Sequence, residues 1–93
     1  QVHNCFKNDA GLNIYPNPSN GRSLFGKLNL KASEAYTIEI FDNLGKPICR
    51  LVSTQPEFTV NFQQTLSSGV YFVKISSNDF SAVKCFLVSH SYR

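Results

Sequence analysis

The sequence predicts an all-β domain, an immunoglobulin-like antiparallel β-sandwich of about seven short strands. Three observations predict it. Apolar and polar residues alternate with a period of two along most of the chain, and no stretch supports an amphipathic helix of useful length. Turn residues separate these stretches at about 8–12-residue spacing. Eight Phe and four Tyr, with no Trp or Met, provide a core of aromatic and branched side chains.

The chain has the size of one small domain. Its 93 residues leave no room for a second core, and 42% apolar against 16% charged residues exclude a disordered tail. Residues 1–11 are polar and unpatterned, so we expect a linker or the edge of a preceding domain there, followed by one domain over residues 12–93. The +3 formal charge comes from scattered basic residues, and we therefore expect no nucleic-acid partner. No apolar run approaches the roughly 18 residues that a membrane-spanning helix needs.

The predicted domain begins with a short strand and a turn. Leu12 to Tyr15 is the strand candidate, and Pro16-Asn17-Pro18 ends it, because two prolines fix φ twice and remove two hydrogen-bond donors. Ser19-Asn20-Gly21 supplies turn chemistry, with Gly21 free to adopt a positive φ.

Six further strands follow, each bounded by turn residues. They are Ser23–Lys31, Tyr36–Ile40, about Pro47–Ser53, the run with Phe58, Val60 and Phe62 inward, Val70–Ser76, and a final strand through Ser89. Between the second and third of these, Asp42-Asn43-Leu44-Gly45 predicts a type I turn that closes a hairpin. The final strand is apolar on both faces, so the sequence leaves its inner side open.

Tyr71 stands just inside a predicted strand, after a corner that contains Gly69. In immunoglobulin-like sandwiches a tyrosine at this place turns its hydroxyl back onto backbone a few residues upstream. We therefore expect Tyr71 to have a buried ring and a hydroxyl bonded near Leu66.

Three cysteines, Cys5, Cys49 and Cys85, cannot all pair within one molecule. The favoured interpretation is that Cys49 and Cys85 are small buried apolar residues on strands. The other is a single disulfide, with Cys5 as one candidate partner, and the sequence leaves the pairing open.

No catalytic constellation is evident in the sequence. His3 and His90 lie near the two ends of the chain, where we expect solvated side chains. The carboxylates fall at turns or on outward strand positions. The cysteines and histidines lack metal-ligand spacing, and the glycines stand singly rather than in a phosphate-binding loop. We therefore expect no enzyme, no metal site and no cofactor.

Aromatic residues also occur on the outward faces of the predicted strands. Phe25, Phe41 and Phe72 lie opposite the inward sets. Loops or a neighbouring domain can cover such rings, and this is the favoured explanation. The alternative is a flat aromatic platform for a sugar or a partner protein.

Four segments, in order, resemble the type A C-terminal sorting domain of the type IX secretion system. The segment from Leu12 to Gly21 contains the family's "YPNP" motif, and Ile38 to Lys46 is similar to its central strand and Gly-Lys turn. The segment from Leu66 to Ile75 looks like the "L-x-x-G-x-Y-x-x-K" element, and Val83 to Val88 looks like the terminal strand. Each motif is weak alone, but four in the right order are specific.

The resemblance implies a non-catalytic export signal. Such domains follow a cargo protein of Bacteroidetes-type bacteria, are recognised by the outer-membrane secretion machinery after passage through the periplasm, and are removed by a surface sortase that can anchor the cargo. It places cleavage upstream of Leu12 and final localisation at the cell surface or outside the cell. The residues that map onto family motif positions are Tyr15, Pro16, Asn17, Pro18, Gly21, Asp42, Gly45, Lys46, Gly69, Tyr71, Lys74, Lys84, Phe86 and Val88.

Backbone geometry explains most of these residues without a partner, but Lys74 and Lys84 interrupt apolar strand faces. Each lysine is either edge protection, which is favoured, or a contact. If the last strand is an edge, its backbone can also be recognised by strand addition.

Two features depart from the family pattern. Residues Ser89 to Arg93 follow the last strand, and three cysteines are unusual. An alternative function is a carbohydrate-binding or adhesion-type accessory module. The sequence leaves open whether the domain forms a weak homodimer.

Overall fold

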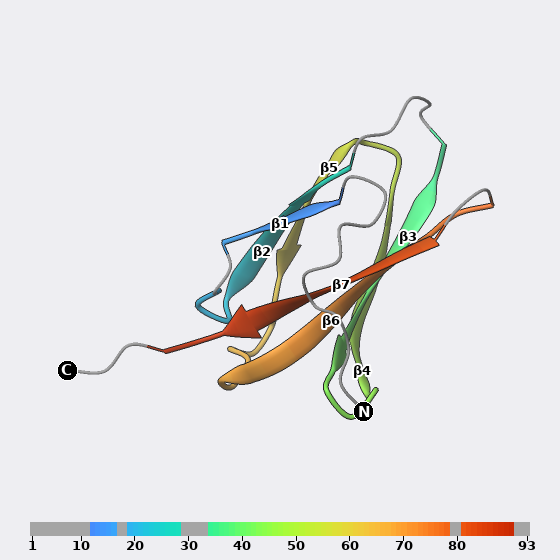
Figure 1. The fold of residues 1–93 in the computed structure, drawn as a ribbon. Coiled ribbons are helices and arrows are strands. Elements are labelled where there is room, and N and C mark those ends of the chain that lie inside the picture. Colours follow the sequence, from blue (N-terminus) through green and yellow to red (C-terminus); the bar gives the residue numbers. More distant parts are fainter. Residues whose placement is uncertain (1–11, 17–18, 29–33, 79–80, 91–93) are drawn as a thin grey trace.

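The computed structural model describes residues 12–16, 19–28, 34–78 and 81–90 (Figure 1). Over these ranges the chain forms strands and turns without a helix, and so without a helix of the length and apolar character that could cross a membrane. The seven strands are β1 (Asn13–Tyr15), β2 (Ser23–Lys27), β3 (Tyr36–Asp42), β4 (Pro47–Ser53), β5 (Glu57–Asn61), β6 (Gly69–Ser76) and β7 (Ser81–Val88).

The strands form two antiparallel sheets, one with the order β1-β2-β5 and one with the order β4-β3-β6-β7. The two sheets pack face to face, with β7 and β4 at opposite edges of the larger one (Figure 1). The predicted all-β antiparallel sandwich of about seven strands is therefore confirmed.

The core lies between the inward faces of the two sheets. Alternating burial along β3 and β5 follows the period of two that the sequence predicts. The buried apolar residues of the core cluster are Leu12, Ile14, Leu24, Leu28, Tyr36, Ile38, Ile40, Phe58, Val60, Tyr71, Val73, Ile75, Phe86 and Val88. Full burial of each such side chain stabilises the fold by about 1.5–3 kcal/mol.

Strand β2 is shorter than predicted and carries a contact that the sequence did not indicate. It ends at Lys27, and the buried Leu28 donates its N–H to the carbonyl of Pro56 (2.7 Å). Gly26 pairs with Phe58, and a Cβ at Gly26 would lie 2.1 Å from Cζ of that ring. The Phe58 ring therefore packs directly over the glycine backbone, and a larger residue would displace it. Leu30, predicted to share the inward face, lies outside the described residues.

The hairpin between β3 and β4 forms where it was predicted. The N–H of Gly45 donates to the carbonyl of Asp42 (3.0 Å), which closes the four-residue turn. Asp42 Oδ1 accepts hydrogen bonds from the N–H groups of Leu44 and Lys46, both at 2.9 Å. Gly45 adopts φ +86°, the left-handed conformation that glycine allows without a Cβ penalty.

The structure identifies the inner face of β7, which the sequence left open. Tyr71 pairs with Phe86 and faces the core, so Phe86 and Val88 point inward together with Ala82. Cys85 lies on the opposite face and is also buried.

The favoured interpretation of the cysteines is wrong. Cys85 is disulfide-bonded. Cys49 is a half-buried free thiol.

Candidate functional site

Three segments that are far apart in the sequence meet at the end of β7. Ser19 pairs with β7 as the parallel bridge partner of Val88. Its N–H donates to the carbonyl of Leu87 (2.7 Å), and its carbonyl accepts the N–H of Ser89 (3.0 Å). The first predicted turn is therefore bonded to the end of the last strand.

Ser19 also organises the turn that follows it. Its side chain is buried, and Oγ accepts the N–H of Gly21 (3.0 Å) and donates to the carbonyl of Ser23 (3.2 Å). A buried hydroxyl with both partners in place avoids the cost of an unsatisfied polar group. The sequence analysis identified the turn but not this role of Ser19.

Gly21 links the same turn to the segment before β6. Its φ of +82° confirms the predicted positive value. Its carbonyl accepts the N–H of Leu66 (2.9 Å), and a Cβ at Gly21 would lie 2.6 Å from the carbonyl oxygen of Leu66. Both the conformation and the close approach therefore require glycine.

The predicted tyrosine corner is confirmed. The Tyr71 hydroxyl donates to the carbonyl of Ser67 (2.7 Å), one residue from the predicted Leu66. The Tyr71 ring is buried and stacks on Phe86, with ring centroids 5.6 Å apart. This contact connects the third resemblance segment to the fourth.

His90 is not the solvated terminal residue that the sequence predicted. It is half-buried, and its Nε2 lies 2.9 Å from the carbonyl oxygen of Leu66. Since a carbonyl only accepts, the proton of this bond lies on Nε2. His3 lies outside the described residues.

Residues 19–21, 42–46, 66–71 and 87–90 together form one end of the sandwich, which we call the motif end. Strand pairing places Asp42 opposite Tyr71 and Gly69 opposite Val88. Most of the predicted site residues lie in the motif end or, as Phe86 does, pack directly against it. Tyr15 and Pro16 lie just before it, and Asn17 and Pro18 lie outside the described residues.

The two lysines lie away from the motif end, in the middle of their strands. Lys74 is exposed on β6, which is an interior strand, so the prediction of edge protection is wrong for this residue. It pairs in register with Glu39, which forms an ion pair with Arg50 (3.8 Å).

Lys84 lies on an edge strand, the position that the favoured interpretation of edge protection requires. It is half-buried, and its Nζ donates to the carbonyl of Leu12 (3.1 Å). An intramolecular hydrogen bond to the segment before β1 is therefore the structural reason for this lysine.

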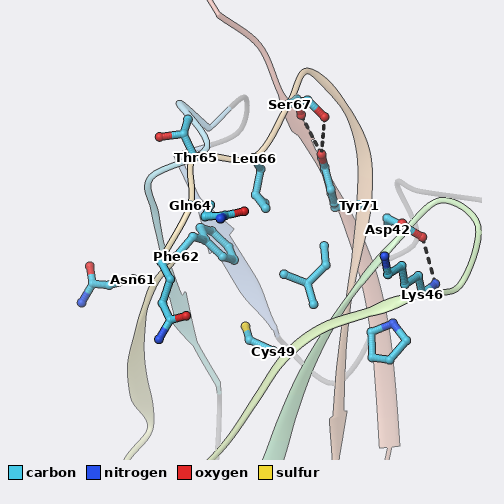
Figure 2. Close-up of a pocket in the computed structure, with 13 residues that line it drawn as sticks. Asp42, Lys46, Cys49, Asn61, Phe62, Gln64, Thr65, Leu66, Ser67 and Tyr71 are labelled. Carbon is cyan, nitrogen blue, oxygen red and sulfur yellow. Dashed lines mark hydrogen bonds between the residues drawn. The ribbon is translucent and has the colours of Figure 1, made fainter.

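A groove of about 620 Å³ opens between β4 and the segment that follows β5, and part of its wall belongs to the motif end: Asp42, Lys46, Leu66, Ser67 and Tyr71. The Cys49 thiol and the side chains of Phe62 and Leu66 point into it, whereas the Asn61 amide points away (Figure 2). Burial raises the pKa of the Cys49 thiol above its ordinary value, so the thiol stays protonated near neutral pH.

Among the described residues that line the groove, the one carboxylate is already engaged elsewhere. Asp42 lies on the wall, but its Oδ1 accepts two hydrogen bonds of the hairpin turn. No group of three or more His, Cys, Asp or Glu side chains that could hold a metal ion occurs within residues 12–16, 19–28, 34–78 and 81–90.

The outward aromatic rings do not form one row. Phe25 is 37% exposed and stacks on Tyr15, with centroids 5.7 Å apart, on the smaller sheet. Phe41 and Phe72 are half-buried partners on the larger sheet. Because the rings belong to different sheets, they do not make the single flat platform that a sugar-binding surface needs.

These features define a class of protein: a small antiparallel β-sandwich module whose predicted motif turns gather at one end. The protein-family model of the secretion system C-terminal sorting domain matches residues 13–89 of the sequence. The chain belongs to that family. Its role is that of a C-terminal sorting signal, which marks proteins exported to the cell surface or secreted. The resemblance found in the sequence is therefore confirmed.

A solved structure supports the fold. It is that of PorZ, described as an essential bacterial surface component of the type-IX secretion system of Porphyromonas gingivalis. The match has a TM-score of 0.73 and 22% sequence identity, and it covers 92% of this chain but 12% of the PorZ chain. The chain thus corresponds to a small part of that protein. No curated protein matches the sequence.

Proposed function

We propose that the motif end is the surface by which the outer-membrane secretion machinery recognises this domain, and that the domain itself catalyses no reaction. The observation that carries the proposal is that residues of all four resemblance segments meet at this end. Ser19 bonds to both sides of Val88, Gly21 bonds to Leu66, and Asp42 lies opposite Tyr71. A surface assembled in this way exists only in the folded domain.

The motif residues fall into two groups by exposure. Tyr71, Phe86 and Val88 are 7%, 1% and 3% exposed, so in the folded domain they position the surface rather than contact a partner. Lys46 is exposed at the hairpin turn and is available for contact. We propose that Lys46 contacts the machinery directly. The buried residues contribute indirectly, because they fix the shape of the surface that the machinery contacts.

The covered end of β7 favours recognition of a folded surface over strand addition at that point. An added strand that extended to the end of β7 would have to bond to the carbonyl of Leu87, which already accepts the N–H of Ser19. Addition at this point therefore requires release of Ser19 and of the turn that it organises.

We further propose that a cargo protein precedes residues 1–11, and that a surface sortase cuts this linker and can anchor the cargo. Leu12 is fully buried in the core, so a cut upstream of it leaves the sandwich complete. A weak homodimer stays a prediction, which sedimentation across a range of protein concentrations tests.

The test is a reporter that carries a signal peptide and residues 1–93, expressed in a host with the secretion system. We expect protease-accessible reporter on intact cells, and periplasmic reporter when the domain is omitted. A matched variant, Phe86→Ala, loses the buried ring beside Tyr71 and should also leave the reporter in the periplasm. Equal surface delivery with and without the domain would contradict the proposal.

A further inference from the structure

The described residues contain two cysteines in different states. Cys85 is disulfide-bonded, whereas Cys49 is a free thiol. The sequence contains three cysteines, and the remaining one, Cys5, lies in the linker. We propose that a disulfide between Cys5 and Cys85 ties the linker to β7, and that it holds the cargo side and the sorting domain together after the linker has been cut.

The surroundings of Cys85 support a covering segment at this point. Cys85 lies on the outer face of β7, between Val83 and Leu87, which are 47% and 48% exposed on the same face. Cys85 itself is only 5% exposed. The low exposure of Cys85 between two half-exposed neighbours agrees with the proposed bond, since a bonded cysteine would be covered by its partner.

The linker starts close enough to reach this point. The carbonyl of Leu12 accepts the Nζ of Lys84, the residue next to Cys85, at 3.1 Å. The seven residues from Cys5 to Leu12 can span roughly 24 Å when extended. This length is sufficient for the chain to pass around the edge of β7 and reach its outer face.

The reactions that form the proposed disulfide, cut the linker and break the disulfide each balance in atoms and electrons. Formation removes two protons and two electrons from the two thiols, by exchange with a disulfide oxidoreductase that leaves as its dithiol. The environment outside the cytoplasm, through which exported proteins pass, favours this oxidation. Hydrolysis of a peptide bond between Cys5 and Leu12 consumes one water and leaves the S–S bond intact. Only a thiol reductant, which returns two electrons and two protons, then separates the two parts.

The second step of the proposal rests on the proposed function, since it assumes that the linker is cut. Release of the sorting domain would then need two events, proteolysis and reduction. Cys49 is a poor competitor for the bond because it lies at the groove, on the edge strand opposite β7.

Peptide mapping tests the bond itself. The full chain is alkylated without reduction and digested with trypsin, which cuts after Lys7 and Lys84 and leaves Cys49 in residues 32–50, since the Lys46–Pro47 bond resists. We expect residues 1–7 linked to residues 85–93, in a monomer two hydrogens lighter than the reduced chain, and an alkylated Cys49. Recovery of residues 1–7 in alkylated form, or linked to residues 32–50, would overturn the proposal.

A second experiment, which does not need the secretion system, tests whether the disulfide retains the cargo after the linker has been cut. A reporter is fused before residue 1, a site-specific protease sequence is inserted after Ala10, and the cut product is run on a denaturing gel. We expect one linked species without reductant and two with dithiothreitol. Cys49→Ser should behave like the parent, and Cys5→Ser, which changes no residue of the sandwich, should separate without reductant. Separation of the unreduced parent would refute the retention, whatever the outcome of the export test.

Discussion

The two edges of the sandwich differ in how their strands are covered. At the β7 edge, Ser19 bonds to the strand end and Lys84 bonds to the segment before β1. At the other edge, β4 and β5 flank a groove of about 620 Å³ that contains the free thiol of Cys49. The family motifs reach both features: Ser19 and Val88 lie where the chain covers its own edge. Asp42, Lys46 and Tyr71 lie on the wall of the groove.

This difference teaches how a sorting signal can combine protection with recognition. An edge strand with free backbone groups invites pairing with other chains in transit. Bonding of Ser19 to β7 reduces that risk and, at the same time, assembles the turns of the motif end. We therefore expect the β7 side to be much more sensitive to substitution than the groove side.

The largest difference in the free energy of unfolding should appear when one phenylalanine beside the motif end and one at the groove are each replaced by alanine. Phe86 is 1% exposed and stacks on Tyr71, so Phe86→Ala should lower the free energy of unfolding by about 3–5 kcal/mol. Phe62 is half-buried at the groove, and Phe62→Ala should lower it by about 1–2 kcal/mol. Urea unfolding with an unchanged m-value measures both, and equal losses would remove the distinction between the two edges.

Two glycines with positive φ provide the next comparison. Gly45→Ala should lower the free energy of unfolding by about 1–2 kcal/mol, the cost of the left-handed conformation, because a Cβ there meets open space. Gly21→Ala should cost at least about 1 kcal/mol more, because the Cβ also collides with the carbonyl oxygen of Leu66. Thermal unfolding of the two variants decides the order, and a larger loss for Gly45→Ala would contradict it.

A smaller effect is expected for the tyrosine hydroxyls. Tyr71→Phe removes the bond to the carbonyl of Ser67 and should lower the free energy of unfolding by about 1 kcal/mol. Tyr15→Phe, at a ring that is 47% exposed, should change it by less than about 0.5 kcal/mol. The urea midpoints of the two variants measure the difference. An unchanged midpoint for Tyr71→Phe would show that the bond from Tyr71 to Ser67 does not contribute to stability.

The smallest effect concerns the pH dependence of Cys49. Burial raises the pKa of its thiol from 9.0, so the unfolded chain ionises first as the pH rises. The contribution of this thiol to stability is therefore complete below the ordinary pKa and is lost as the pH rises through the folded value. Alkylation of the folded chain by iodoacetamide should reach half of its maximal rate above pH 9. Half-maximal alkylation below this pH would show that the thiol is activated rather than buried.

Local patterns were sufficient to predict the strands, the hairpin turn, the Gly21 conformation and the Tyr71 corner. Each depends on residues within a few positions of one another. The bridge from Ser19 to Val88 and the bond from His90 to Leu66 could not be predicted, because they depend on how distant segments pack. Gly26 was missed for the same reason, since its requirement comes from the Phe58 ring of another strand.

The last strand shows a different limit. Both of its faces are apolar, so alternation alone did not identify the inner one. The structure explains the ambiguity: Phe86 packs in the core, and Cys85 on the outer face is buried and disulfide-bonded. A disulfide bond of Cys85 leaves no periodic signal in the strand itself.

The central claim is that the secretion machinery recognises the folded motif end. Surface delivery of a reporter fused to a domain with one reversed charge tests it most directly. Lys46 and Lys27 are both exposed, but only Lys46 lies in the motif end. If the machinery recognises the folded motif end, Lys46→Glu should reduce the protease-accessible reporter on intact cells by about tenfold, as loss of about 1.4 kcal/mol of binding predicts, with an unchanged melting temperature. Lys27→Glu should leave delivery unchanged. Equal delivery of the two variants, both folded, would contradict the account.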